Sequence, residues 1–95
     1  MQKKYQWDSE KNRTNQTKHG ISFEDAKEVF EDNDRIQYIT YRGYERRWKT
    51  VGSILGVLFS VVYTMRKTVF RIISARRANK KEKRDYSHNK SKKQA

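Results

Sequence analysis

The sequence predicts an α+β fold in which a small antiparallel sheet of four strands carries two N-terminal helices and is followed by a C-terminal helix. Three observations lead to this prediction. Helical spacing and cap residues fill the first third of the chain, alternation typical of strands fills the middle, and helical spacing returns near the end. The length of 95 residues allows one domain with one modest core. Short turns between successive strands favour an antiparallel meander with both N-terminal helices on one face.

The first predicted helix begins after Trp7 and ends at Gly20. Asp8 can cap its N-terminus, and a glycine readily adopts the left-handed conformation that ends many helices. Almost no apolar side chain lies between these ends, so the helix is either a solvated cover or a polar binding surface. On one side it carries, at helical spacing, Lys11, Asn15 and Lys18, with His19 beside them.

A capping-box pattern at Ser22–Asp25 opens the second predicted helix. Its apolar residues form a single stripe, while its acidic residues occupy the other face. We expect the stripe to pack in the core and the acids to face water, so neither requires a chemical role. The stripe consists of Phe23, Ala26, Val29 and Phe30.

Beyond Asn33–Asp34 the period changes from that of a helix to that of a strand. The predicted strands span residues 35–41, 46–51, 54–64 and 68–75, and the predicted turns lie near Gly43, at Gly52–Ser53 and at residues 65–67. The continuous apolar run at residues 54–63 predicts a central strand covered on both sides. That run is about half the ~20 residues that a membrane-spanning helix requires, and the N-terminus lacks the apolar stretch of a signal peptide. Neither a membrane span nor a secretory signal is expected.

From Arg76 onward the chain is predicted to be helical again, with Ala78, Glu82 and Tyr86 at four-residue spacing. Residues 87–95 contain several lysines and no apolar anchor, which predicts a disordered basic tail. The predicted domain therefore spans residues 1–86, and the predicted tail spans residues 87–95.

The formal net charge is +12, and the charge is uneven along the chain. Residues 21–40 hold two basic and six acidic residues, a net charge of −4, whereas the rest of the chain is basic. Such an excess favours binding to a polyanion, RNA above all, or to an acidic partner protein. The absence of cysteine excludes disulfides and thiolate metal sites, and it fits a cytoplasmic location.

Motifs for metal, cofactor or serine-nucleophile chemistry are absent from the sequence. The two histidines lie far apart, and no phosphate-cradling glycine loop or Gly-x-Ser-x-Gly elbow occurs. We therefore expect no metal ion and no cofactor. Metal-independent phosphodiester cleavage fits the composition, because it needs a group to take the 2′-OH proton, cations to stabilise the phosphorane, and a proton donor for the leaving oxygen.

Glu45 and Arg47 lie two residues apart, so on a strand they project from the same face. A carboxylate beside an arginine suits either a general base held in place or a simple surface ion pair. Trp48 projects from the opposite face, where we expect it to pack in the core rather than to stack on a base.

Arg71 interrupts an apolar row on the fourth predicted strand. That strand places it on one face with Val69, Ile73 and Ala75. Burial there is costly unless a bound phosphate or a structural ion pair, for example with Glu45, compensates the charge. Arg76 and Arg77, at the end of the strand, suit either phosphate binding or a solvated pair.

Blocks of residues with a recognisable order and spacing extend from about Tyr5 to Tyr86. They include Trp7-Asp8, Lys18-His19-Gly20-Ile21-Ser22-Phe23, Glu45-x-Arg47-Trp48, Val61-Val62-Tyr63-Thr64 and Arg71-Ile72-Ile73-Ser74-Ala75-Arg76. In this order they resemble the BrnT family, the ribonuclease toxins of BrnT–BrnA type II toxin–antitoxin systems. The chain departs from the family at residues 39–44, which lack the usual Asp-Pro loop.

The resemblance implies a RelE-like fold and metal-independent endoribonuclease activity that arrests translation. It implies a BrnA-type antitoxin as partner, a ribbon–helix–helix DNA-binding protein, in a heterotetramer with two copies of each chain. By position, the implied catalytic candidates are His19, Glu45, Arg47, Arg71 and Arg76, with Glu45 or His19 as proton acceptor and the arginines as phosphate clamps. The RNA-binding candidates are Lys11, Asn15, Lys18, Arg77 and Lys80.

Two other functions fit the basic charge. A non-catalytic RNA- or DNA-binding module would bind with steep salt dependence but leave the nucleic acid uncut. A binder of anionic membrane surfaces would act through residues 80–93, although an RNA substrate without membrane attachment is the favoured interpretation.

Overall fold

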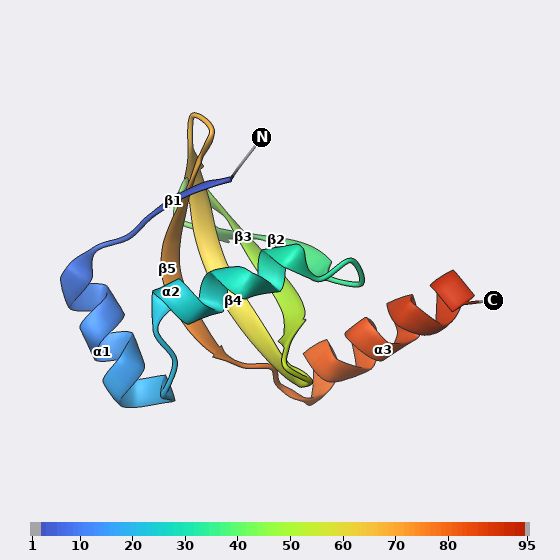
Figure 1. Ribbon diagram of the computed structural model, residues 1–95. Helices are drawn as coiled ribbons and strands as arrows, with labels where there is room; N and C mark the ends of the chain where they lie inside the picture. Colours follow the sequence, from blue (N-terminus) through green and yellow to red (C-terminus); the bar gives the residue numbers. More distant parts are fainter. Residues whose placement is uncertain (1–2, 95) are drawn as a thin grey trace.

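The computed structural model describes residues 3–94, which form one five-stranded sheet with helices around it (Figure 1). The predicted domain and tail also include Met1, Gln2 and Ala95, which lie outside the described residues. The strands are β1 (Lys4–Gln6), β2 (Ile36–Arg42), β3 (Glu45–Ile54), β4 (Val57–Arg66) and β5 (Val69–Arg77). The helices are α1 (Ser9–His19), α2 (Phe23–Ala26), the 3-10 helix η1 (Lys27–Glu31) and α3 (Lys80–Gln94). None of the helices described is long and apolar enough to cross a membrane.

The prediction of a four-stranded antiparallel sheet is wrong, because the sheet has five strands and is mixed. Its order is β1-β5-β4-β3-β2, in which β1 pairs with β5 in parallel and the other neighbours are antiparallel. β1 contains three residues, too few for hydrophobic alternation to reveal a strand. Tyr5 holds it in place by packing between Phe30 and Phe70, with ring centroids 5.6 and 5.5 Å away.

α1 begins and ends at the predicted cap residues, and α2 begins at its predicted cap but continues after Ala26 as the 3-10 helix η1. The Asp8 side chain accepts hydrogen bonds from two backbone N–H groups of α1, and Gly20 ends the helix with φ of 73°. The Ser22 hydroxyl accepts from a backbone N–H of α2. In Figure 1, α1 lies beside β5, whereas α2 and η1 cross in front of the sheet.

The main core lies between the sheet and the stripe of α2 and η1, as the stripe predicts. Its buried residues include Phe23, Ala26, Val29, Phe30, Val61, Tyr63, Ile72 and Ala75. Trp48 packs against this cluster, which confirms its predicted core position. We call this side of the sheet the helix face, and the opposite side the groove face.

Gly52 lies inside β3 rather than in the predicted turn at Gly52–Ser53, which is therefore wrong. A Cβ atom at Gly52 would lie 2.7 Å from the carbonyl oxygen of Val29, so only glycine lets η1 approach the strand this closely. The turn instead falls at Leu55–Gly56, where both residues have positive φ, 50° and 83°. β4 follows it and is the middle strand of the sheet, as predicted.

A bulge in β5 places Arg71 on a different face from the predicted one. Thr64 pairs with Arg71 and Val62 pairs with Ser74, so the ladder skips Ile73. The skipped residue reverses the alternation of faces along β5. Ala75 therefore lies in the core on the helix face, whereas Arg71 lies on the groove face. The predicted face of Arg71 is wrong because sequence alternation cannot reveal an inserted residue.

α3 is helical through Gln94 and so includes residues for which the sequence predicts a disordered tail. Its buried residues Glu82 and Tyr86 face the sheet, and Tyr86 joins a second apolar cluster with Val51 and Ala78. Near its C-terminal end, Lys93 Nζ donates to the carbonyl oxygen of Asn33 at 2.7 Å.

Candidate active site

A groove of about 520 Å³ opens on the groove face over β2, β3, β4 and β5. Four cationic side chains line it: Arg42 from β2, Arg47 and Lys49 from β3, and Arg76 from β5. Arg47 and Lys49 are two residues apart on one strand, so both project into it. We call this feature the cationic groove, and no acidic residue lines it.

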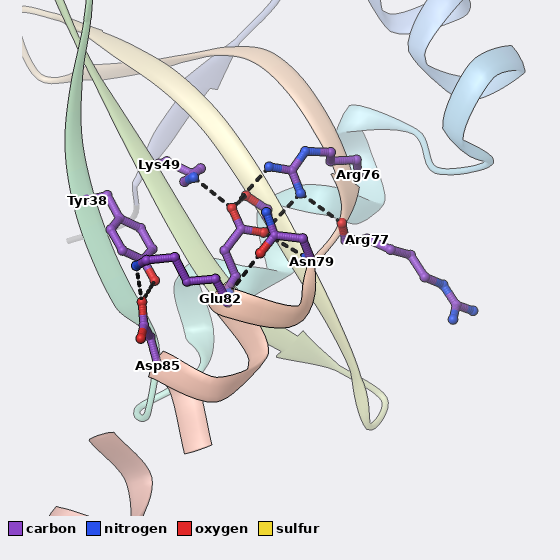
Figure 2. A network of polar contacts seen from close by, with 9 residues as sticks. Tyr38, Lys49, Arg76, Arg77, Asn79, Glu82 and Asp85 are labelled. Carbon is purple, nitrogen blue, oxygen red and sulfur yellow. Dashed lines mark hydrogen bonds and ion pairs between the residues drawn. The ribbon is translucent and has the colours of Figure 1, made fainter. Parts of the chain in front are cut away.

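A buried carboxylate on α3 holds two of these cations (Figure 2). The Glu82 side chain is only 2% exposed, and both its oxygens accept from the Arg76 guanidinium, at 2.9 and 3.0 Å. Lys49 Nζ lies 2.6 Å from Glu82 Oε2. Residues from β3, β5 and α3 therefore meet in one charged network that lies under the cationic groove.

The carboxylate of Glu82 also caps α3, which explains why the chain places it here. Asn79 Oδ1 accepts from the Glu82 backbone N–H at 2.8 Å, and Glu82 Oε1 accepts from the Asn79 N–H at 2.9 Å. This reciprocal pair is a capping box. One residue thus starts the helix and neutralises part of the charge of the groove.

Glu82 is unsuited to taking a proton. Burial alone would raise its pKa, but hydrogen bonds from Arg76, Lys49 and the Asn79 N–H outweigh burial and lower the pKa to about 2. A carboxylate of such low pKa, with its lone pairs already engaged, stays ionised at neutral pH. Its contribution is to orient the two cations rather than to exchange protons.

Tyr38 packs beside Lys49 and fixes the other side of this cation. Its ring lies 4.8 Å from Lys49 Nζ and 5.4 Å from Lys81 Nζ, and its hydroxyl donates to Asp85 Oδ2 at 2.6 Å. Burial raises the pKa of Tyr38, and the neighbouring carboxylate of Asp85 raises it further. The phenol therefore stays protonated and acts as a support for Lys49.

Glu45 and Arg47 form the ion pair that their spacing predicts. Arg47 Nε donates to Glu45 Oε1 at 2.7 Å, and the Glu45 side chain is 53% exposed. Glu45 also pairs across the hairpin with Arg42, so it lies at the rim of the cationic groove. It combines an orienting arginine with access to solvent, which Glu82 lacks.

Arg71 lies across β4 from Arg47 on the groove face. Thr64 of β4 pairs with Arg71 of β5. On its other side, β4 pairs with β3 as far as Tyr63 and Trp48, which are the residues next to Thr64 and Arg47. Within residues 3–94 no ion pair joins Arg71 to Glu45, so the compensating contact considered from the sequence does not form.

The candidates on α1 surround a second hollow of about 310 Å³, the α1 hollow. Lys11, Lys18 and His19 line it together with Ser74 of β5. Because Ser74 pairs directly with Val62, which lines the cationic groove, the two hollows adjoin across β4 and β5. The sequence candidates on α1 and on the strands therefore share one surface.

Asn15 is buried and serves the fold. Its Nδ2 donates to the Ile21 carbonyl oxygen, and its Oδ1 accepts from the Ala75 N–H, both at 3.0 Å. The second bond satisfies the edge of β5 beyond the end of β1. Both ends of the amide are engaged, so Asn15 shapes the wall of the α1 hollow.

Arg77 and Lys80 lie apart from the cationic groove. Lys80 is exposed at the start of α3. Arg77 lines a different hollow of about 760 Å³ on the helix face. We call it the acidic hollow, because its charged lining otherwise consists of Asp25, Glu28, Glu31 and Asp32.

Sequence reasoning missed three members of the site: Arg42, Lys49 and Glu82. Lys49 follows Glu45 and Arg47 at the same two-residue interval, so strand alternation could have found it. Asn79 followed three residues later by Glu82 could have indicated the capping box. Arg42 becomes recognisable only from the pairing register of the hairpin.

Among the residues described, no group of three His, Asp or Glu side chains lies close enough to hold a metal ion. The model of a protein family described as "Ribonuclease toxin, BrnT, of type II toxin-antitoxin system" matches residues 7–82. No curated protein matches the chain. The matched range contains every cation of the cationic groove and also Glu82.

Proposed function

The chain belongs to the BrnT family of ribonuclease toxins, and from this premise we propose that its cationic groove cleaves RNA without a metal ion. The observation that carries the proposal is the convergence of four cations on one groove, with an accessible carboxylate at the rim. Such a site can bind a phosphodiester and supply charge where the phosphorane develops.

In the proposed reaction, Glu45 takes the proton of the ribose 2′-OH. The 2′ oxygen then attacks the adjacent phosphorus, and the bond to the 5′ oxygen breaks as that oxygen gains a proton. The products are a 2′,3′-cyclic phosphate and a 5′-hydroxyl end. Arg47 holds Glu45 in place through the 2.7 Å hydrogen bond. His19 in the adjoining α1 hollow is the other candidate for proton transfer.

The cations stabilise the negative charge of the phosphorane. Arg47 and Arg76 project into the groove, and Arg71 lies across β4 on the same face. Glu82 acts as a positioning residue, since it fixes Arg76 through two hydrogen bonds and Lys49 through one contact. Groups fixed in advance need no reorganisation when charge develops.

The flanking RNA would extend from the cationic groove into the α1 hollow. Lys11 and Lys18 would contact its phosphates there, and their side chains are exposed. Lys80, which is exposed at the start of α3 outside both hollows, would add longer-range attraction. Such contacts give affinity without sequence specificity. Arg77 lines the acidic hollow on the helix face and would not contact this RNA.

A type II toxin has a protein antitoxin as its partner, and we propose one of BrnA type, with a ribbon–helix–helix fold and two copies of each chain in the complex. An acidic segment of that partner would neutralise the toxin by covering the cationic groove. The cleavage would arrest translation, and the site of action would be the cytoplasm.

The test is RNA cleavage by the purified protein in excess EDTA. We expect fragments that end in 2′,3′-cyclic phosphate, little cleavage by Glu45→Gln, and normal cleavage by the matched surface variant Arg13→Ala. Arg13 suits this purpose because it is an exposed arginine on α1 paired with Glu10. RNA that stays intact in EDTA and in cells overproducing the protein would contradict the proposal, and tight binding without cleavage would indicate a non-catalytic module.

A further inference from the structure

The β2–β3 hairpin exposes large apolar side chains that contribute nothing to the core. Ile39, Tyr41 and Tyr44 are 60%, 62% and 107% exposed. Among the described residues only one other large apolar side chain is comparably exposed, Leu55 at the β3–β4 turn. A cluster of solvated aromatic residues on one element indicates a binding surface.

The end of this hairpin is separate from the middle strand of the sheet. β3 pairs with β4 only from Trp48 onward, whereas residues 45–47 pair with β2 alone. Gly43, with φ of 62°, makes the tight turn, and Tyr44 follows it at the tip. Residues 40–47, which we call the ribbon, therefore have two open faces.

The ribbon is continuous with the proposed active site and is positively charged. Arg42 lines the cationic groove, and Tyr41 borders it but pairs with Arg46, so its ring projects from the other face of the hairpin. Residues 40–47 hold three arginines and one glutamate, a net charge of +2. Exposed tyrosines beside arginines match single-stranded RNA, whose unpaired bases stack on aromatic rings while its phosphates bind cations.

We propose that the ribbon is a base-stacking platform for single-stranded RNA, with Tyr44 at the tip and Tyr41 on the other face of the hairpin stacking on nucleobases of the strand where it leaves the cationic groove. The inference rests on the proposed function and adds the part of the substrate that is recognised. It also makes unpaired RNA the preferred substrate, because paired bases offer no free ring face.

The experiment measures binding of a fluorescent single-stranded 2′-O-methyl oligoribonucleotide, which lacks the attacking hydroxyl and so cannot be cleaved. Each of Tyr41→Ala and Tyr44→Ala should weaken binding at least about fivefold, the equivalent of ~1 kcal/mol per stacked base. The dependence on salt should stay unchanged, because no charge is removed. Tyr44→Phe should bind normally, because the ring is retained.

Two controls separate stacking from other effects. Leu55→Ala removes an equally exposed apolar side chain at a distant turn and should leave binding unchanged. An oligonucleotide of the same length with abasic sites should bind wild type and the tyrosine variants equally, since only nucleobases can stack.

Binding by Tyr41→Ala and Tyr44→Ala at wild-type strength, in a protein that cleaves RNA, would overturn the platform and leave the proposed function intact. Loss of antitoxin binding in these variants without loss of RNA binding would also overturn it and would assign the ribbon to a protein partner. A wild-type protein that neither binds nor cleaves RNA would instead contradict the proposed function itself.

Discussion

Two hollows on opposite faces of the sheet carry opposite charges. The cationic groove, of about 520 Å³, has four cationic lining residues and no acidic one. The acidic hollow is larger, about 760 Å³, and its lining has four carboxylates and one arginine. The net charge of +12 describes neither surface, because the fold sorts the two signs onto different faces.

The comparison also shows how one helix supports both hollows. Glu82 of α3 holds two of the four cations of the groove, while Tyr86, one turn later, donates to Asp32 Oδ2 at 2.6 Å beside the acidic hollow. Asp32 is further engaged by the Ser53 N–H at 2.7 Å. Both carboxylates are structural anchors, and only the groove adds a set of cations that line its surface.

The largest expected effect is on cleavage by the groove. Arg47→Ala removes a cation from the groove and releases Glu45 from its 2.7 Å hydrogen bond. We expect the cleavage rate to fall by about 100-fold or more, comparable to the loss of one donor to a developing oxyanion. The slope of log K for RNA binding against log salt should also fall by about 1. Cleavage at more than a tenth of the wild-type rate would place the chemistry elsewhere.

The next effect concerns stability and its dependence on pH. The folded-state pKa of Glu82 is lowered from 4.5 to about 2, so its stabilisation is present above pH 4.5 and is lost as the pH falls toward 2. Over that interval it amounts to about 3 kcal/mol. In urea unfolding, the free energy of unfolding of Glu82→Gln should be lower than that of wild type by this amount at pH 7, and the difference should shrink toward pH 2. If the difference in free energy of unfolding between wild type and variant does not change with pH, the charge of Glu82 does not stabilise the fold.

Folded Glu82→Gln also tests the positioning role. We expect cleavage to slow mainly through kcat, since Arg76 and Lys49 remain present but less well oriented, and Glu82→Asp should restore part of the rate. A variant that is less stable but cleaves RNA at the wild-type kcat would limit Glu82 to the fold.

The comparison explains which parts of the molecule the sequence could predict. Local signals such as the Asp8 and Ser22 caps concern neighbouring residues, and the structure contains both. Features that depend on distant pairing were missed. They are the parallel strand β1, the bulge that turns Arg71 to the groove face, and the approach of Val29 that requires Gly52 within β3.

In the candidate site, too, contacts between near neighbours could be predicted and contacts between distant elements could not. Spacing on one strand predicted that Glu45 and Arg47 would meet, and they do. The contact between Arg76 and Glu82 joins a strand to a later helix, and Lys49 completes it from another strand. Spacing along the chain does not reveal contacts between side chains of different elements until the pairing register of the strands is known.

A smaller effect is expected where α3 meets the acidic hollow. Tyr86→Phe removes the hydroxyl that donates to Asp32 at 2.6 Å and should destabilise the protein by about 1.5–3 kcal/mol, a typical value for a hydrogen bond to a charged group. Cleavage per folded molecule should stay at the wild-type rate, because Tyr86 does not line the groove. A cleavage defect at full folding would show that the two hollows are coupled through α3.

The smallest effect is expected from removing a charge in the acidic hollow itself. Glu28→Gln raises the net charge from +12 to +13, so a protein that bound RNA by overall charge would bind it more tightly. If RNA occupies only the groove face, Glu28 lies on the far side of the sheet, beyond the ~8 Å over which salt screens charges at physiological ionic strength. We therefore expect RNA affinity and cleavage to change by less than about twofold. If Glu28→Gln raised RNA affinity by as much as Arg47→Ala lowers it, net charge and not the arrangement of the groove would determine where RNA binds.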